Sequence, residues 1–387
     1  MSLFANCMYM GLDSFVRLAI PLFILCGYLM QSCGLSERLV DGVSVWVGNI
    51  RGSMGMITII ACTIFAALTG SAPATVAAIG AIMLPALYKQ GYNESQAGGV
   101  ICAAACLGPI IPPSIGMIVY GALMSVSIPK MFAGAIVPGL MRSFGMIILN
   151  QIQVRRWGMK AEKRKPEPGE RRKKTLAAIP AMLMPVFILG SIYGGVCTPS
   201  EAACIACVYA LILGVCMRTL NVKNVWSALK RTCATTAAVG FIMANVQLFC
   251  WILNYTRIPA KLSAFVMGYT TNPNVFMAIV CLIILVEGCF MESLSIIAIM
   301  APILSPIGVA MGIDPVHMGV AFCLCMVMGV ITPPFGVNLF FGVATTGISY
   351  DKIVKGVLPY LIINIAIVVF CCFCPPTTQW LVHLIYG

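Results

Sequence analysis

The stretch Gly108-Pro-Ile-Ile-Pro-Pro-Ser114 places two consecutive prolines inside an apolar run that is long enough to cross a membrane as one helix. Pro112 and Pro113 have no N–H to donate, and their rings clash with the preceding turn, so a continuous helix must break here. In hydrocarbon, each carbonyl oxygen freed by the break costs several kcal/mol unless protein, water or a cation satisfies it. The stretch therefore predicts a broken helix with a polar or ion-binding site at its centre.

A second copy of this stretch, Gly329-Val-Ile-Thr-Pro-Pro-Phe335, carries Pro333 and Pro334 at the matching positions. One constant shift lays Gly91–Gly121 over Gly312–Gly342, and the matched residues are mainly Gly and Pro, whose backbone roles are specific. We interpret the chain as a duplicated unit. Paired interrupted helices in the two halves of a membrane protein indicate the ion and substrate site of a transporter.

The composition sets the class of protein. Of the 387 residues, 60% are hydrophobic and 9% are charged, and the mean hydropathy is +0.98. A soluble domain has roughly a quarter of its residues charged, so this composition excludes an ordinary soluble fold. It indicates a polytopic helical membrane protein.

The net charge of +12 is concentrated in one segment. Ten of the 24 Lys and Arg residues fall between Arg155 and Lys174, so we expect the loop 153–175 to be cytoplasmic by the positive-inside rule. Nucleic acid binding is disfavoured because Trp157 is the one aromatic residue that interleaves these charges.

The 19 cysteines lie mostly in apolar helices, where a free thiol packs as a small hydrophobic group. Cys204-Ile-Ala-Cys207 and Cys371-Cys-Phe-Cys374 have C-x-x-C spacing, but neither adjoins the strand-turn-helix pattern of a thiol redox site. A membrane-embedded thiol enzyme is therefore the weaker alternative. The chain has two histidines, too few for a multi-histidine metal cage, and it lacks the H-E-x-x-H zinc motif.

Two apolar segments predict helical hairpins. Residues 54–88 are interrupted by Thr69-Gly-Ser-Ala-Pro73, and residues 274–306 are interrupted by Glu287-Gly-Cys-Phe-Met-Glu-Ser293. Each half is about 15 residues long, which at 1.5 Å per residue is too short to cross about 30 Å of hydrocarbon. We therefore predict two re-entrant hairpins whose tips lie at mid-membrane.

Each hairpin is followed by its broken helix, at residues 94–124 and 315–346, so tip and break can meet. Ser71 and Glu292, near the tips, would then either cap a helix or bind a cation. Several neutral oxygens suit Na⁺, and half-helix N-termini suit an anionic substrate. The predicted sodium-site residues are Thr69, Gly70, Ser71, Gly108, Ser114, Gly288, Glu292, Gly329 and Thr332, with Asn338 as a further oxygen donor.

The remaining spans and surface segments follow from hydropathy. We predict spans at 12–31, 128–152, 176–195, 201–217, 232–253 and 353–373, and amphipathic surface segments at 36–50, 222–231 and 257–270. Thr198-Pro-Ser-Glu201 is typical of a helix start. Arg17 either reaches the membrane interface with its charged end or binds a substrate carboxylate.

A family resemblance extends in order along nearly the whole chain. The motifs that carry it are Leu18-Ala-Ile-Pro-Leu-Phe-Ile-Leu25, Thr69-Gly-Ser71, Gly91-Tyr92, Gly108-Pro-Ile-Ile-Pro-Pro-Ser114, Thr198-Pro-Ser-Glu-Ala-Ala203, Met291-Glu292, Gly312-Ile-Asp-Pro-Val-His317 and Ile331-Thr-Pro-Pro-Phe-Gly-Val-Asn-Leu-Phe340. Together they resemble the large membrane subunit of tripartite ATP-independent periplasmic (TRAP) transporters, the DctM family. The resemblance implies a carrier rather than an enzyme.

The resemblance also implies a mechanism and partners. It implies an all-α polytopic fold with two inverted repeats that works as an elevator, in the bacterial inner membrane. The expected activity is sodium-coupled symport of an organic acid, such as a C4-dicarboxylate or a sialic acid. The expected partners are a periplasmic substrate-binding protein and a small membrane subunit. The alternative is a stand-alone sodium-coupled carboxylate carrier of the same ion-transporter superfamily, which needs no binding protein.

The resemblance divides the chain into scaffold and transport segments. Residues 1–53 and 128–273 are expected to form scaffold, 54–127 and 274–346 the two transport repeats, and 347–387 a C-terminal span and tail. Family members usually carry a further N-terminal span before the position of Met1. Thr69 and Pro73 depart from the usual tip pattern, and Arg17 stands where the family is often apolar, which favours a substrate contact. The predicted substrate contacts are Arg17, Ser71, Ser114 and Asn338.

Overall fold

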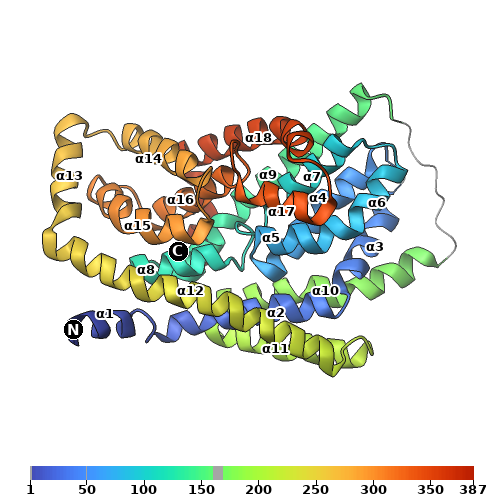
Figure 1. Cartoon of the computed structure of the whole chain (residues 1–387), viewed down its shortest axis with the longest axis horizontal. Coiled ribbons are helices and arrows are strands. Elements are labelled where there is room, and N and C mark those ends of the chain that lie inside the picture. Colours follow the sequence, from blue (N-terminus) through green and yellow to red (C-terminus); the bar gives the residue numbers. More distant parts are fainter. Residues whose placement is uncertain (1, 49, 160–168) are drawn as a thin grey trace.

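The computed structural model describes residues 2–48, 50–159 and 169–387, and all regular elements within these ranges are helical (Figure 1). Seven of the described helices are long and apolar enough to cross a membrane, or up to eight if a bent pair, α2 (Ala19–Ser32) and α3 (Leu35–Val47), forms one span. These helices confirm the predicted all-α polytopic class.

The other helices of the first half are α1 (Ser2–Met10), α4 (Ser53–Thr69), α5 (Ala72–Thr75), α6 (Ala81–Lys89), α7 (Glu94–Ala105), α8 (Ile115–Met124) and α9 (Ile128–Arg156). A 3₁₀ turn at Phe15–Leu18 precedes α2, and a π-helical turn at Val76–Gly80 joins α5 to α6. The second half contains α10 (Glu170–Tyr193), α11 (Pro199–Cys216), α12 (Val222–Thr256), α13 (Ile258–Tyr269), α14 (Pro273–Gly288), α15 (Ser293–Ala310), α16 (Pro315–Gly329), α17 (Val337–Thr346), α18 (Tyr350–Phe373) and α19 (Pro376–Tyr386).

The helices form two sets. The hairpin set, α4–α9 and α14–α19, is held together by contacts of α18 with α7 and α9, of α14 with α16, and of α4 with α7. The frame set consists of α1–α3 and α10–α13. Within it, α2 packs on α11 and α12, and Figure 1 shows these three helices along the lower edge of the molecule. Contacts of α4 with α2 and α3 join the two sets.

The position of α9 changes the grouping that the sequence suggested. The resemblance places residues 128–152 in the scaffold. These residues belong to α9, which packs on α4, α8, α16 and α18 of the hairpin set. The segment 374–387, expected as a tail, forms α19, which packs on α9. The contacts therefore group the helix after the first break with the hairpin set.

Each predicted hairpin is a pair of helices with contacting arms, α4 with α5 and α6, and α14 with α15. The second arms are longer than we expected: Ala72–Lys89 and Ser293–Ala310 each contain 18 residues. At 1.5 Å per residue such an arm is about 27 Å long, so helix length alone does not make these hairpins re-entrant. The position of their tips, described below, is the stronger argument.

Two surface segments differ from the sequence prediction. Residues 222–231, expected as a separate interfacial helix, are the first part of the continuous 35-residue helix α12. The basic loop 153–175 is shorter than expected, because α9 runs to Arg156 and α10 begins at Glu170; residues 160–168 lie outside the described ranges.

By contrast, Thr198 and Glu201 form the predicted cap, in which each side chain accepts the other residue's backbone N–H.

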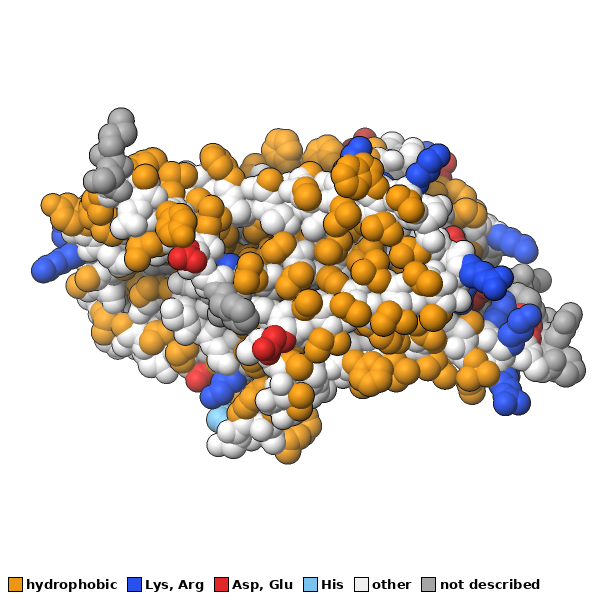
Figure 2. Space-filling view, turned by 90° about the horizontal axis from the view of Figure 1, so that it is seen from below, with side chains coloured by type: hydrophobic (Ala, Val, Ile, Leu, Met, Phe, Trp, Pro, Cys, Tyr) orange, Lys and Arg blue, Asp and Glu red, His pale blue; other side chains and the backbone are white. Residues whose placement is uncertain are grey.

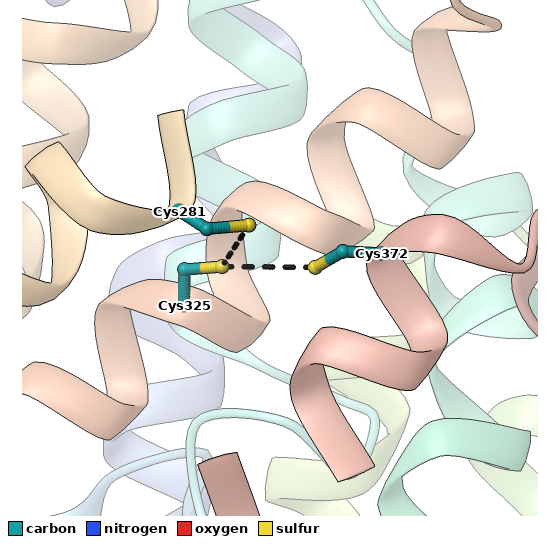
Figure 3. Close-up of side chains that lie close together, drawn as sticks. All are labelled: Cys281, Cys325 and Cys372. Carbon is teal, nitrogen blue, oxygen red and sulfur yellow. Dashed lines mark hydrogen bonds between the residues drawn. The ribbon is translucent and has the colours of Figure 1, made fainter. Parts of the chain in front are cut away.

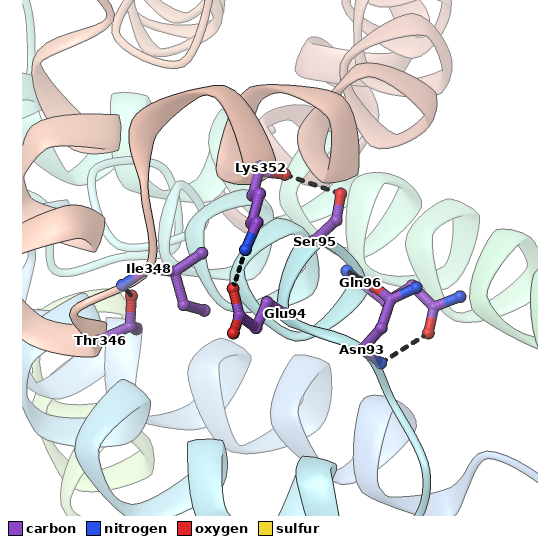
Figure 4. A network of polar contacts seen from close by, with 7 residues as sticks. All are labelled: Asn93, Glu94, Ser95, Gln96, Thr346, Ile348 and Lys352. Atoms are coloured by element: carbon purple, nitrogen blue, oxygen red, sulfur yellow. Dashed lines mark hydrogen bonds and ion pairs between the residues drawn. The ribbon is translucent and has the colours of Figure 1, made fainter.

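The two halves of the duplication meet where α7 and α18 begin. Lys352 Nζ lies 2.6 Å from a carboxylate oxygen of Glu94, and the Ser95 hydroxyl donates to the Lys352 carbonyl over 2.7 Å (Figure 4). The ion pair contributes little, because both side chains are about half exposed. The packing of α7 on α18 depends more on a pair of glycines, Gly99 and Gly356. A Cβ on Gly99 would lie 2.6 Å from the Gly356 Cα, so the two backbones are in direct contact.

The outer surface carries many large apolar side chains. Figure 2 shows an almost continuous apolar face, with Lys and Arg concentrated toward its right-hand end. Exposed examples include Val186 and Phe187 on α10, Ile212 on α11, Phe241 on α12 and Ile362 on α18. An apolar face of this extent suits hydrocarbon rather than water.

Candidate functional site

The first hairpin tip lies against the first helix break. Gly70 has a left-handed backbone (φ +59), and a Cβ built on it would lie 2.8 Å from the Pro113 carbonyl oxygen and 3.1 Å from the Ile115 nitrogen. A Cβ on Gly108 would likewise lie 2.8 Å from the Ser71 carbonyl oxygen. Glycine at both positions therefore lets the tip backbone touch the break backbone.

The second half repeats this contact with another glycine pair. A Cβ on Gly288 would lie 2.5 Å from the Gly329 Cα, and the Gly336 N–H donates to the Cys289 carbonyl over 3.0 Å. The structure thus brings each tip to its break, as the sequence predicted. Each tip lies against the middle of a broken helix, which supports a hairpin that reaches mid-depth and turns back.

A cavity of about 520 Å³ lies where the two tips, the two breaks and the frame set converge. Among the predicted site residues, Gly70, Ser71, Glu292 and Asn338 line it. The frame set contributes residues from α2 and α12, which are Ile24, Tyr28, Gln31, Arg231, Thr235 and Val239.

Two predicted residues offer unpartnered polar atoms beside this cavity. The Asn338 side chain is buried, and its Nδ2 donates to the Cys102 carbonyl over 3.2 Å, while its Oδ1 has no hydrogen-bond partner. The Ser71 backbone begins α5, but its hydroxyl makes no capping bond and no other hydrogen bond with the described residues. Both oxygens are therefore free to accept a ligand.

The cavity also contains one charge of each sign. A Glu292 carboxylate oxygen accepts the Leu294 N–H over 2.9 Å, so this residue caps α15, one of the two roles that we considered. Arg231, on α12, makes no hydrogen bond or ion pair with the described residues. A guanidinium without a protein partner can bind a carboxylate through two parallel hydrogen bonds.

Arg231, Tyr28 and Thr235 line the cavity but are not among the residues that the sequence predicts for a site. Arg231 was assigned to an interfacial segment, whereas the continuous α12 brings it to the cavity. One signal was available, because Arg231, Thr235 and Val239 are spaced four residues apart and share one helix face. Tyr28 and Thr235 bond through their hydroxyls over 3.2 Å, which connects α2 to α12 beside the cavity.

Other predicted hydroxyls bond within their own segments. The Ser114 hydroxyl is buried and donates to the Pro109 carbonyl over 2.6 Å, and the Thr332 hydroxyl donates to the Met328 carbonyl over 2.7 Å. The Thr69 hydroxyl lies 3.2 Å from the Thr75 hydroxyl, beside a small cavity of about 40 Å³. These three oxygens are less available to an ion than Ser71, although each keeps a lone pair.

Arg17 is not brought to the cavity. Its Nη1 donates to the Met10 carbonyl over 2.7 Å, next to the turn that precedes α2. Glu287, on the first arm of the second hairpin, is also outside the cavity, and one of its carboxylate oxygens is buried without a hydrogen-bond partner.

Arg142 is a buried cation that the sequence analysis did not single out. It lies fully buried on α9, and its Nε donates to the Asn364 side chain over 2.9 Å, while both terminal nitrogens lack partners. Its position within a long apolar span was the available signal, because an ionisable residue inside such a span is costly and usually functional.

Hairpins and broken helices that meet around a shared cavity are typical of secondary transporters. The family model "Tripartite ATP-independent periplasmic transporter, DctM component" matches residues 1–377. The chain therefore belongs to the DctM family of TRAP transporter large permease subunits.

Similar proteins differ in the substrate that their names give. The C4-dicarboxylate TRAP transporter large permease protein DctM of Pseudomonas aeruginosa is 36% identical, with 94% of this chain and 85% of that protein covered. The sialic acid permease SiaM of Vibrio cholerae is 33% identical, covering 97% and 88%. The 2,3-diketo-L-gulonate permease YiaN of Escherichia coli is 33% identical, covering 94% and 86%.

A solved structure shares the fold. The Alcanivorax borkumensis YdaH transporter superposes with a TM-score of 0.70, covering 94% of this chain and 86% of that chain, at 15% sequence identity. At this identity the likeness shows the fold alone.

Proposed function

We propose that this permease subunit carries out sodium-coupled uptake of an organic acid across the bacterial inner membrane. The observation that carries the proposal is the cavity of about 520 Å³, which joins both hairpin tips, both helix breaks and Arg231, a cation with no ion pair among the described residues. A periplasmic substrate-binding protein delivers the acid, and a small membrane subunit completes the transporter. The loop 153–175 faces the cytoplasm in this arrangement.

The substrate in this proposal is a small organic anion with at least one carboxylate. Arg231 supplies the positive charge that binds it. The helices α8 and α17 begin beside the cavity, where Ile115 and Asn338 line it, and their N-termini favour negative charge. The substrates named for the relatives, a C4-dicarboxylate, a sialic acid and a diketogulonate, are acids of this kind.

The coupling ion in this proposal is Na⁺, held by neutral oxygens at the tips and breaks. The Ser71 hydroxyl and the Asn338 side-chain oxygen are supported as ligands because neither has a hydrogen-bond partner among the described residues. Hard cations prefer several oxygen ligands. Backbone oxygens freed at the two breaks can complete the set. The remaining predicted sodium ligands stay predictions.

The mechanism in this proposal is an elevator in which the hairpin set slides along the frame set. The cavity supports it, because Tyr28, Arg231 and Thr235 come from the frame set, whereas Ser71 and Asn338 come from the hairpin set. Movement between the sets would carry a bound ligand away from its frame contacts.

Reconstitution into proteoliposomes tests the function. We expect uptake of a labelled acid only with an inward sodium gradient, the small subunit and the loaded binding protein. Uptake of the free acid without the binding protein would instead support the stand-alone carrier.

Substituting Arg231 tests the substrate contact. We expect Arg231→Gln to raise the KM for the acid at least about tenfold, equivalent to about 1.4 kcal/mol, because a charged hydrogen-bond donor is lost. Arg231→Lys should keep part of the affinity. The control is Lys230→Gln, since Lys230 lies over the Trp226 ring and is absent from the cavity lining. Unchanged kinetics in Arg231→Gln would remove this residue from the site.

A further inference from the structure

Three thiols from distant parts of the chain converge within the hairpin set. Cys281 lies on α14, Cys325 on α16 and Cys372 on α18, and Figure 3 shows their side chains pointing toward one another. The Cys325 sulfur lies 3.3 Å from that of Cys281 and 3.7 Å from that of Cys372. All three sulfur atoms lie within 4.8 Å of one another.

This convergence differs from the packing of the other cysteines. Among the described residues, this is the one group of three or more His, Cys, Asp or Glu side chains close enough to share a metal ion. Cys323, on the same helix as Cys325, is equally buried but does not belong to the group. A thiol that only fills space needs no other thiols beside it.

A cavity of about 240 Å³ adjoins the cluster at Cys372. Cys372 lines it, as does Met277, one helical turn before Cys281. Asp314, His317 and Gln379 also line this cavity and give it a polar wall. The cluster therefore borders a partly polar cavity on the side of Cys372.

We propose that Cys281, Cys325 and Cys372 bind one soft metal ion, of the kind represented by Zn²⁺ or Cu⁺, as three thiolates. Soft thiolate ligands select such ions over Na⁺, Mg²⁺ or Ca²⁺, which prefer oxygen. Metal–sulfur bonds of about 2.3 Å place three sulfur atoms about 3.7–4.0 Å apart, close to the separations observed. Each thiol that binds releases one proton to water.

His317 positions this site rather than binding the ion. Its Nδ1 lies 2.7 Å from the Thr378 hydroxyl and its Nε2 lies 3.1 Å from the Cys372 carbonyl oxygen, so both ring nitrogens have partners. These contacts fix the end of α18, which carries the Cys372 sulfur. Hydrogen bonds of this kind orient metal ligands.

The site is separate from the proposed sodium site. Neither Asp nor Glu belongs to the group of close ligand atoms found among the described residues, and none of the three cysteines lines the cavity of about 520 Å³. A bound ion would join α14, the first arm of the second hairpin, to α16 and α18. It would therefore stabilise the hairpin set whether or not the chain transports an acid.

Cadmium titration of the full chain in detergent tests the proposal, with a phosphine reductant present. We expect a cadmium–thiolate charge-transfer absorption, and one more bound Cd²⁺ per chain in the wild type than in Cys325→Ser, measured by mass spectrometry after gel filtration. The matched control, Cys323→Ser, should bind as much Cd²⁺ as the wild type. Cd²⁺ should also raise the thermal unfolding midpoint of the wild type and the control, but not that of Cys325→Ser.

A second variant separates a lost site from a misfolded chain. Cys281 is partly exposed, so Cys281→Ser should fold and should lose the same equivalent of Cd²⁺. Equal Cd²⁺ stoichiometry and equal stabilisation in the wild type and in Cys281→Ser would overturn the proposal, and would show that these thiols only pack together.

Discussion

At the scale of single residues, two hydroxyl groups that the sequence predicts equally as sodium ligands differ in their availability to an ion. Ser71 lines the cavity and its hydroxyl has no partner within the described part of the chain, whereas the Thr332 hydroxyl donates to the carbonyl of Met328, near the end of α16. An oxygen without a protein partner loses no protein hydrogen bond when an ion binds. The structure therefore favours Ser71 over Thr332 as a sodium ligand, a distinction that the sequence does not make.

This ranking predicts different effects for two matched substitutions. We expect Ser71→Ala to raise the sodium concentration for half-maximal uptake about five- to tenfold, equivalent to losing an interaction of about 1 to 1.4 kcal/mol. Thr332→Ala should change it less than twofold. Sodium titrations of uptake in proteoliposomes measure both. Equal shifts in the two variants would contradict the ranking, and an unchanged Ser71→Ala would remove Ser71 from the sodium ligands.

Residues that line the cavity were predictable where a local motif marks them. Gly70, Ser71 and Asn338 belong to short motifs beside a break or tip, and all three line the cavity. Arg231 had no such motif, and it reaches the cavity because α12 continues through a segment that looked interfacial. Arg17 was predicted as a substrate contact, but it lies at a turn before α2, outside the cavity. The packing of the helices decides whether a charged side chain such as that of Arg231 or Arg17 reaches the cavity, and this packing cannot be deduced from a single sequence.

At the scale of helices, each hairpin depends on glycine where it meets its broken helix. Gly288 on α14 and Gly329 on α16 touch through their Cα atoms, so the backbones are closer than any side chain allows. Small residues permit this approach between membrane helices. The contact holds the second tip beside the second break, where the proposed ion site lies.

A methyl group at this contact should therefore separate the two elements. We expect Gly288→Ala to destabilise the chain by about 1–3 kcal/mol through overpacking, and to lower uptake more than its stability loss explains. The control is Gly268→Ala on α13, because a Cβ there meets no atom within 4 Å. Thermal unfolding and uptake at equal protein amounts measure both effects. A Gly288→Ala variant as stable and active as the control would show that the close approach is dispensable.

Elements were predictable where the backbone itself is interrupted. Pro112 and Pro113 lie in the break between the end of α7 at Ala105 and the start of α8 at Ile115, and Pro333 and Pro334 lie in the break between Gly329 and Val337. Such breaks follow from local stereochemistry. The length of the second hairpin arms did not follow, because α5 already begins at Ala72, before Pro73, and α15 continues through Pro306 to Ala310. Packing and neighbouring groups can keep a membrane helix intact at an internal proline.

At the scale of the whole molecule, the two helix sets meet where α2 approaches α4. A Cβ on Gly27 of α2 would lie 3.2 Å from the Thr69 Cα and 3.3 Å from the Leu68 carbonyl oxygen. This contact joins the frame set to the hairpin set beside the smaller cavity. In an elevator, such a contact must break in each cycle, whereas contacts within either set persist.

A cross-link across this boundary therefore tests the proposed movement. Cysteines at positions 27 and 69 would have their backbones close enough for a disulfide, which needs Cβ atoms about 3.5–4.5 Å apart. We expect oxidation of the Gly27→Cys, Thr69→Cys pair to lower uptake at least about tenfold, and reductant to restore it. Each single variant, oxidised in the same way, controls for the native cysteines and for the loss of Thr69. Peptide mass spectrometry measures the cross-linked fraction. Continued uptake by a fully cross-linked chain would mean that α2 and α4 stay together during transport, and the sliding mechanism would then be wrong.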